Sequence, residues 1–194
     1  MAEQFALEGF DSPPKPTDRL FFAIFPSEDA AERIAQLAQQ LRAKHGLKGK
    51  LLATGRFHVT LHHLGDFVGL PQGIVAAACG AAASVAMPPF EVTFDRAMSF
   101  NRPSNRPFVL RGGAGLAALM PFQQALNTAL NHAGLGGGKA NAHFTPHVTL
   151  LYDDRDVAEQ AIEPITWTVN EFVLVRSLIG KTLHIQLARW PLLV

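Results

Sequence analysis

The chain has 194 residues, of which 48% are hydrophobic and 17% charged, and its formal net charge is +1. This composition predicts one packed globular domain and excludes wholesale disorder. The longest uncharged run, 112–138, is interrupted by polar residues and proline, no apolar signal core begins the chain, and Cys79 is the only cysteine. We therefore expect no membrane span, no secretion and no intramolecular disulfide, and we predict a cytoplasmic protein.

The first half of the chain predicts a tail followed by alternating strands and helices. Residues 1–18 are rich in proline and predict a flexible tail before a single domain over 19–194. A continuous apolar run over 20–25 predicts a buried strand. Asp29 and Glu32 form a capping-box pattern before an amphipathic helix that ends at Gly46. Strands over 57–64 and 90–94 flank a predicted helix over 74–85.

The second half repeats this mixture of elements. We predict a strand over 107–111, a helix over 116–132 that Gly134 ends, and a strand over 147–152. Two further strands are expected over 167–176 and 182–188, and in the latter His184 and Gln186 alternate with apolar residues. The glycine-rich segment 134–142 lacks the P-loop pattern and predicts a loop. Strands and helices without a regular parallel alternation predict an α+β fold.

The charges are distributed unevenly along the chain. Residues 33–65 contain six lysines and arginines and no acid, and residues 96–152 contain five and no acid. Such cationic segments attract anions, although lysines and arginines also serve simply to solvate helix faces.

The strongest internal signal is a four-residue repeat. The sequence HVTL occurs at His58–Leu61 and again at His147–Leu150, and each copy lies near the end of one of the two cationic segments. Side chains alternate along a strand, so the histidine and threonine of each copy share one face while valine and leucine point into the core. The histidine and threonine positions are then about 7 Å apart, close enough for both side chains to reach one phosphate.

Two histidines beside one anion favour acid–base catalysis. The ordinary pKa of histidine lies near neutrality, so one imidazole can donate a proton while the other accepts one. Hydroxyl and basic groups would stabilise the charge on a pentacoordinate phosphorus. A strained cyclic phosphodiester fits this chemistry, which requires neither a metal nor another cofactor.

These residues resemble a known family. The paired motifs, the first strand RLFFAI (19–24), the continuation HVTLxxLG (58–65) and the second copy PHVTL (146–150) are similar to the 2H phosphoesterase superfamily. Within that superfamily the chain is most similar to the RNA 2′,3′-cyclic phosphodiesterases, historically called 2′-5′ RNA ligases. The resemblance implies a bilobal α+β fold in which two pseudo-symmetric lobes with antiparallel sheets flank a central cleft and helices lie outside.

The resemblance also implies roles for the motif residues. His58 would donate a proton to the leaving ribose oxygen, His147 would activate water, and Thr60 and Thr149 would hold the phosphate, so that a 2′-phosphomonoester forms. RNA with a 2′,3′-cyclic phosphate end or a small cyclic nucleotide would be the substrate of a monomeric enzyme, and joining of RNA ends would use the same proton transfers in reverse. The sequence does not choose among these substrates. Further candidates for substrate binding are Arg56, Phe57, Phe144, Tyr152, Arg155 and Arg176.

Two other interpretations stay open at this point. The clustered histidines His58, His62, His63, His143 and His147 suggest a metal-dependent hydrolase. Along a regular strand, however, His58 and His62 would be about 13 Å apart, too far for one zinc ion. A metal site that uses one histidine from each motif stays open. A non-catalytic RNA-binding module would instead use the cationic segments and stack bases on Phe57 and Phe144.

Overall fold

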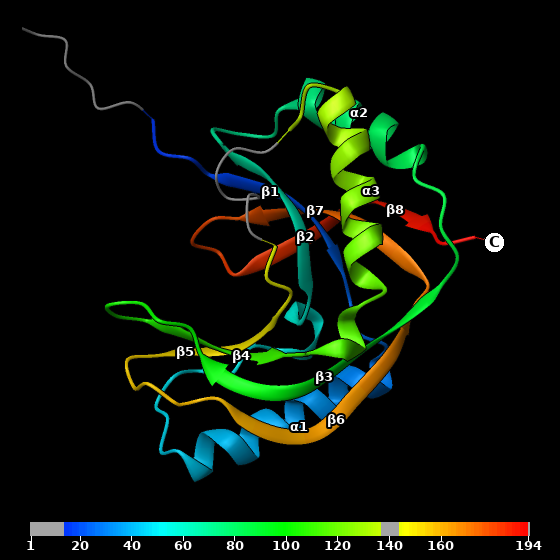
Figure 1. The fold of residues 1–194 in the computed structure, drawn as a ribbon. Helices are drawn as coiled ribbons and strands as arrows, with labels where there is room; N and C mark the ends of the chain where they lie inside the picture. Colours follow the sequence, from blue (N-terminus) through cyan, green and yellow to red (C-terminus); the bar gives the residue numbers. More distant parts are fainter. Residues whose placement is uncertain (1–13, 137–143, 194) are drawn as a thin grey trace, which may run out of the picture.

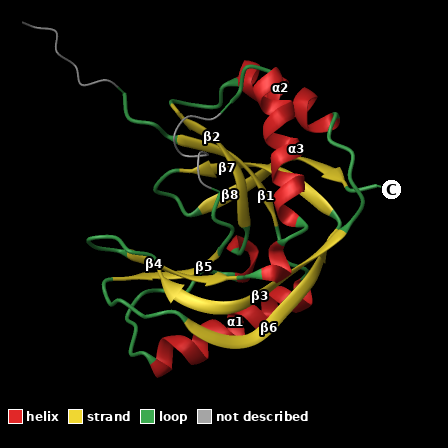
Figure 2. Ribbon diagram, viewed as in Figure 1, coloured by secondary structure: helices red, strands yellow, loops and turns green. Residues whose placement is uncertain are grey.

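The protein, described here from a computed structural model over residues 14–136 and 144–193, contains two four-stranded antiparallel sheets (Figures 1 and 2). The first sheet has the strand order β2-β1-β7-β8 and the second has the order β5-β4-β3-β6. The strands of the first sheet are β1 (Asp18–Ile24), β2 (Val59–Phe67), β7 (Glu171–Leu178) and β8 (Leu183–Pro191). Those of the second are β3 (Phe90–Ser99), β4 (Arg106–Arg111), β5 (Val148–Asp153) and β6 (Gln160–Val169).

Three α-helices cover the outer faces of these sheets. Helix α1 (Glu28–Lys44) contacts β5 and β6, and Figure 1 shows it on the side of the second sheet that faces away from the first. Helices α2 (Gln72–Ala83) and α3 (Leu119–His132) pack against each other and against β8 and β2 of the first sheet. The described residues also form two short 3₁₀ helices, η1 (Thr54–Arg56) and η2 (Ala114–Leu116). The predicted α+β class with two antiparallel sheets is confirmed.

The main apolar core lies between the sheets and the helices. It includes Phe22 and Phe172 from the first sheet, Phe94 from the second, Ile34 from α1 and Phe122 from α3, each fully buried. A smaller apolar cluster, Phe21, Ala23, Val173 and Val175, lies on the opposite face of the first sheet. Side chains alternate along strands, so one face of the first sheet packs in the main core. The opposite face, which carries the smaller cluster, is not covered by that core and can form a site.

The ends of several elements differ from the sequence prediction. Helix α1 is capped by Ser27, whose Oγ accepts a hydrogen bond from the Ala30 amide at 3.3 Å, and not by Asp29. The single strand predicted over 167–176 is two strands, β6 and β7, which are separated at Asn170. The propensity pattern missed this break because strand-forming residues lie on both sides of it.

The predicted tail also extends too far into the chain. The Thr17 amide donates to the Phe67 carbonyl at 2.8 Å, and Asp18 begins β1 with its carboxylate buried and paired with Arg176. Residues 1–13 of that tail, and residues 137–142 of the predicted glycine-rich loop, lie outside the described residues. Within the described part of the chain, no helix is long and apolar enough to cross a membrane.

Candidate active site

The two motif copies occupy equivalent places in the two sheets. His58 immediately precedes β2 and His147 immediately precedes β5, and each of these strands forms one edge of its sheet. Thr60 pairs with Ala23 of β1, and Thr149 pairs with Val109 of β4. The valine and leucine of both copies are buried, as the alternation of strand side chains predicted. The fold therefore presents the two histidine–threonine pairs in the same way.

Both strands contain a β-bulge at the motif leucine. The pairing of β1 with β2 skips Leu61, and the pairing of β4 with β5 skips Leu150. A bulge leaves backbone groups without a partner in the ladder, and here other elements supply the partners. Gln123 of α3 donates to the Leu61 carbonyl at 3.2 Å, and the Leu52 amide donates to the Leu150 carbonyl at 2.9 Å.

The first bulge decides where His62 points. On a regular strand His62 would share the face of His58 and Thr60. Because Leu61 is the extra residue, His62 turns into the interior, where its Nδ1 donates to Asn127 Oδ1 at 2.6 Å. His62 therefore does not lie on the face of His58 and Thr60.

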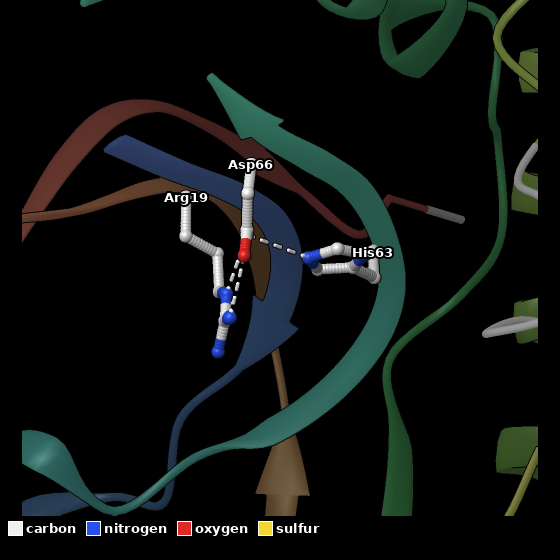
Figure 3. A network of polar contacts seen from close by, with 3 residues as sticks. All are labelled: Arg19, His63 and Asp66. Carbon is white, nitrogen blue, oxygen red and sulfur yellow. Dashed lines mark hydrogen bonds and ion pairs between the residues drawn. The ribbon is translucent and has the colours of Figure 1, made fainter. Parts of the chain in front are cut away.

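His63 belongs to a separate polar network, which Figure 3 shows. Its Nε2 lies 3.2 Å from Asp66 Oδ1, and Arg19 binds the same carboxylate through two hydrogen bonds of 2.7 Å. Among residues 14–136 and 144–193, no group of three His, Cys, Asp or Glu side chains is placed to hold a metal ion. His143, part of the metal hypothesis, lies outside these ranges.

Equivalent hydrogen bonds fix the tautomers of the two motif histidines. His58 Nδ1 lies 2.7 Å from the Arg56 carbonyl oxygen, and His147 Nδ1 lies 2.8 Å from the Thr145 carbonyl oxygen. A carbonyl only accepts hydrogen bonds, so each Nδ1 carries the proton. In the neutral ring, each Nε2 then has a free lone pair and can act as a base.

Burial lowers the pKa of both histidines. The pKa of His58 falls to about 4, mainly through burial, and further because the charge of Arg56 and any proton on His184 or His147 would repel a proton on His58. Burial also lowers the pKa of His147, and the charges of Arg111 and Arg102 lower it further. A proton on His147 therefore disfavours a proton on His58, as expected of two imidazoles that share one site.

Aromatic rings hold the two imidazoles in place. The His58 ring contacts Phe21 and Phe25, with centroids 5.1 and 6.0 Å away. The His147 ring meets Phe100 edge to face at 4.8 Å. These apolar neighbours limit hydration of the rings and explain the burial that lowers their pKa values.

Two arginines supply positive charge next to the histidines. Arg56 precedes His58 by two residues, and Arg111 follows Leu110, which pairs with Val148 beside His147. The Nε atoms of both arginines are buried and have no hydrogen-bond partner among the described residues. Buried donors are almost always paired, so these two atoms favour an anion as their partner.

Only part of the cationic segments reaches this site. Arg33, Arg42 and Lys44 lie on α1, where their side chains bind Pro164, Gly49 and Gln160. Because α1 lies beyond the second sheet, these residues are separated from the histidines by that sheet. The site contains Arg56 from the first segment and Arg111 and Arg102 from the second.

Several predicted substrate-binding residues are engaged in contacts within the fold. Phe57 is 1% exposed and belongs to the core, so its ring is not available to stack on a base, and Phe144 packs against the same core. Arg176 is paired with Asp18, and Arg155 donates to the His45 carbonyl at 2.8 Å. These interactions occupy the side chains in holding the fold together.

Tyr152 lies on the site face but at the far end of β5. It pairs with Pro107 of β4, whereas Thr149 pairs with Val109, so the two side chains share one face. Tyr152 follows His147 by five positions along the chain, roughly 16 Å at the usual rise of a strand. Its side chain is exposed and lies well away from the two imidazoles.

The sequence did not identify His184 or Arg111 as site residues. His184 of β8 meets His58 edge to face with ring centroids 5.3 Å apart. The alternation in the predicted strand 182–188 placed His184 on a polar face. It did not indicate that this face lies next to His58. Arg111 similarly ends a predicted strand whose partner strand the sequence did not specify.

Comparison with known proteins identifies the family of this chain. A family model described as the 2′-5′ RNA ligase superfamily matches residues 26–180, which include both motif copies. The chain is 27% identical to a solved structure described as a phosphoesterase, with a TM-score of 0.70, and the match covers 92% of this chain and 99% of that one. No curated protein matches the chain significantly.

Two structures of E. coli LigT are similar as well. The complex with 3′-AMP is 26% identical with a TM-score of 0.65, and the complex with phosphate is 27% identical with a TM-score of 0.66. Each match covers 92% of this chain and 99% of LigT. Because the family model spans most of the sequence and both motifs, the chain belongs to the 2′-5′ RNA ligase superfamily of 2H phosphoesterases.

Proposed function

We propose that the protein is an enzyme that hydrolyses 2′,3′-cyclic phosphodiesters to 2′-phosphomonoesters, with His58 and His147 as general acid and base. The observation that carries the proposal is the equivalence of the two motifs. Each histidine immediately precedes an edge strand and is anchored through Nδ1 to the carbonyl two residues earlier. Two Nε2 atoms are thereby left for chemistry at one anion.

The reaction requires two proton transfers and no metal. His147 Nε2 accepts a proton from water while the water oxygen forms a bond to phosphorus. The bond from phosphorus to the ribose O3′ breaks, and O3′ takes the proton that His58 Nε2 carries. One water is consumed, a 2′-phosphomonoester is left, and exchange with solvent resets both rings. The assignment of donor and acceptor follows the family resemblance.

Hydroxyl and guanidinium groups would hold the phosphate during these steps. Thr60 and Thr149 lie two residues after the histidines on the same faces of their strands, as the two β-bulges begin only after them. The buried Nε atoms of Arg56 and Arg111 add charged donors near each ring. Donors fixed around non-bridging oxygens stabilise the charge of the pentacoordinate state.

The substrate itself would prepare His58 to act as the acid. Burial and neighbouring positive charge hold the pKa of His58 at about 4 in the free protein, so the ring is neutral near pH 7. A bound phosphate brings negative charge next to the imidazole, and an opposite charge raises the pKa of a histidine. Proton uptake by His58 is therefore coupled to substrate binding.

Relatives support a nucleotide substrate. Structures of E. coli LigT contain 3′-AMP in one case and phosphate in another. An RNA end bound at the two histidines would continue along the face of β5 toward Tyr152. The non-catalytic RNA-binding alternative loses one of its two proposed stacking platforms, because Phe57 is buried in the core.

The test is to incubate the purified protein with nucleoside 2′,3′-cyclic phosphates in EDTA and to identify the monoester by ³¹P NMR. We expect the 2′-monoester to accumulate at the same rate with and without the chelator. An RNA with a cyclic phosphate end, with and without a second RNA bearing a 5′-hydroxyl, separates hydrolysis from joining of ends. Binding of these RNAs without any turnover would overturn the proposal in favour of a binding module.

A further inference from the structure

A third histidine contacts the site from the opposite edge of the first sheet. His184 of β8 pairs with Ser177 of β7, and its ring meets His58 edge to face at 5.3 Å and an interplanar angle of 75°. The same ring contacts Phe21 at 5.6 Å and 76°. His184 therefore forms part of the wall around His58, although the acid–base scheme gives it no role.

The Nδ1 atom of His184 is buried and has no hydrogen-bond partner among the described residues. Leaving a buried polar atom without a partner costs about 1–3 kcal/mol, so such atoms are rare unless a ligand completes them. Burial and the charge of Arg56 both lower the pKa of His184 below its usual value, which favours the neutral ring. A neutral imidazole suits an uncharged hydroxyl of a sugar better than it suits a phosphate oxygen.

His184 also makes the two halves of the site unequal. The ring that contacts His147 edge to face is Phe100, which offers no hydrogen bond. The motif pairs themselves are presented identically by β2 and β5. A cyclic phosphodiester has two chemically similar bridging oxygens, and two equivalent histidine–threonine pairs provide no means of telling one oxygen from the other.

We propose that His184 is the specificity-determining residue that binds the ribose next to His58 and so selects which bridging oxygen leaves. This inference rests on the proposed function and specifies how the substrate is oriented in that site. With the ribose held on the His58 side, O3′ faces the acid and the product is the 2′-monoester. Without His184 the nucleoside binds in both orientations, and both monoesters form.

The experiment compares the wild-type protein with His184→Phe, which keeps a ring against His58 and reproduces the environment that Phe100 gives His147. Cytidine 2′,3′-cyclic phosphate is the probe, and the ratio of 2′- to 3′-monoester is measured by ³¹P NMR. We expect this ratio to fall about tenfold or more, which corresponds to the loss of one hydrogen bond. His184→Gln retains a hydrogen-bonding group and should restore part of the ratio, whereas the surface variant His132→Phe should leave it unchanged.

A binding measurement separates this inference from the proposed function. The dissociation constants of 2′-AMP, 3′-AMP and inorganic phosphate are measured for the same variants by calorimetry. We expect His184→Phe to lose discrimination between the two nucleotides while it binds inorganic phosphate as tightly as the wild type, which also shows that the site is folded. If the wild type turns over no cyclic phosphate, the proposed function fails, and the binding measurement still tests His184.

Two results overturn the inference. The first is an unchanged product ratio and unchanged nucleotide discrimination in His184→Phe when circular dichroism shows a folded protein. The second is a wild-type protein that does not distinguish 2′-AMP from 3′-AMP at all. If His184→Phe does not fold, the product ratio of His184→Gln is compared with that of the wild type. A ratio of 2′- to 3′-monoester in His184→Gln that equals the ratio in His132→Phe would count against the inference.

Discussion

His58 and His147 are anchored by the same interaction, a hydrogen bond from Nδ1 to the carbonyl oxygen two residues earlier. The bond prevents the ring from flipping and leaves Nε2 as the reactive nitrogen in both cases. Because β2 and β5 begin directly after these residues, the rings keep fixed positions relative to their sheets.

Removing either imidazole should nearly abolish turnover. We expect His58→Gln and His147→Gln each to lower kcat by roughly 10²–10⁴-fold, the usual contribution of a positioned proton transfer. The matched control is His132→Gln, a histidine at the end of α3, which should retain wild-type activity. Wild-type rates in either motif variant would exclude that histidine from the reaction, provided that thermal unfolding is unchanged.

Loss of a motif hydroxyl should weaken catalysis without affecting the fold. Thr60→Val and Thr149→Val preserve the shape and strand propensity of the side chain. A hydrogen bond to a charged group contributes about 1.5–3 kcal/mol, so we expect kcat/KM to fall tenfold or more in each variant. Steady-state kinetics would be compared with those of Thr128→Val, a change on the exposed surface of α3.

Arg111 should contribute more to phosphate binding than the lysines and arginines on the protein surface. Its buried Nε has no partner among the described residues, and its charge lowers the pKa of His147. We expect Arg111→Gln to weaken binding of inorganic phosphate at least tenfold and to raise the pKa of His147, which NMR titration of the imidazole would detect. Lys50→Gln removes an exposed charge from the first cationic segment and should change neither quantity.

Acid should destabilise the protein partly through His58. Its pKa is about 4 in the folded state and 6.5 ordinarily, so between these values the unfolded chain binds a proton that the folded protein does not. The free energy of unfolding therefore decreases as the pH falls from 6.5 to 4, by up to about 3 kcal/mol for this residue. Urea unfolding at pH 7.5 and 4.5 should show a smaller decrease for His58→Gln than for wild type or His132→Gln, and equal decreases would contradict the assignment.

Gln123 should stabilise the β-bulge of the first motif. Its side-chain amide donates to the Leu61 carbonyl at the β-bulge, and the residue is buried. We expect Gln123→Leu to lower the free energy of unfolding by about 1–3 kcal/mol, because a buried carbonyl would lose its partner. The neighbouring variant Gln124→Leu, on the exposed side of α3, should have little effect in the same denaturant titration.

Local patterns in the sequence were sufficient for much of the fold. The apolar run at 20–25, the helical spacing over 29–46 and the alternation in each motif predicted elements that the structure contains, because burial is governed by short periodicities. The break at Asn170 and the Ser27 cap were missed, since each depends on a single residue within a continuous pattern. The β-bulges were also missed, and with them the inward turn of His62.

The duplicated HVTL motif by itself determined that this chain has two equivalent histidine–threonine pairs, on two strands, of the kind found in the 2H phosphoesterases. Which residues surround those pairs was decided only by the tertiary structure. Arg111 reaches His147 because β4 pairs with β5, and His184 reaches His58 because β8 and β2 belong to the same sheet. Strand order and register join residues that are distant along the chain, and no local periodicity in the sequence encodes that pairing.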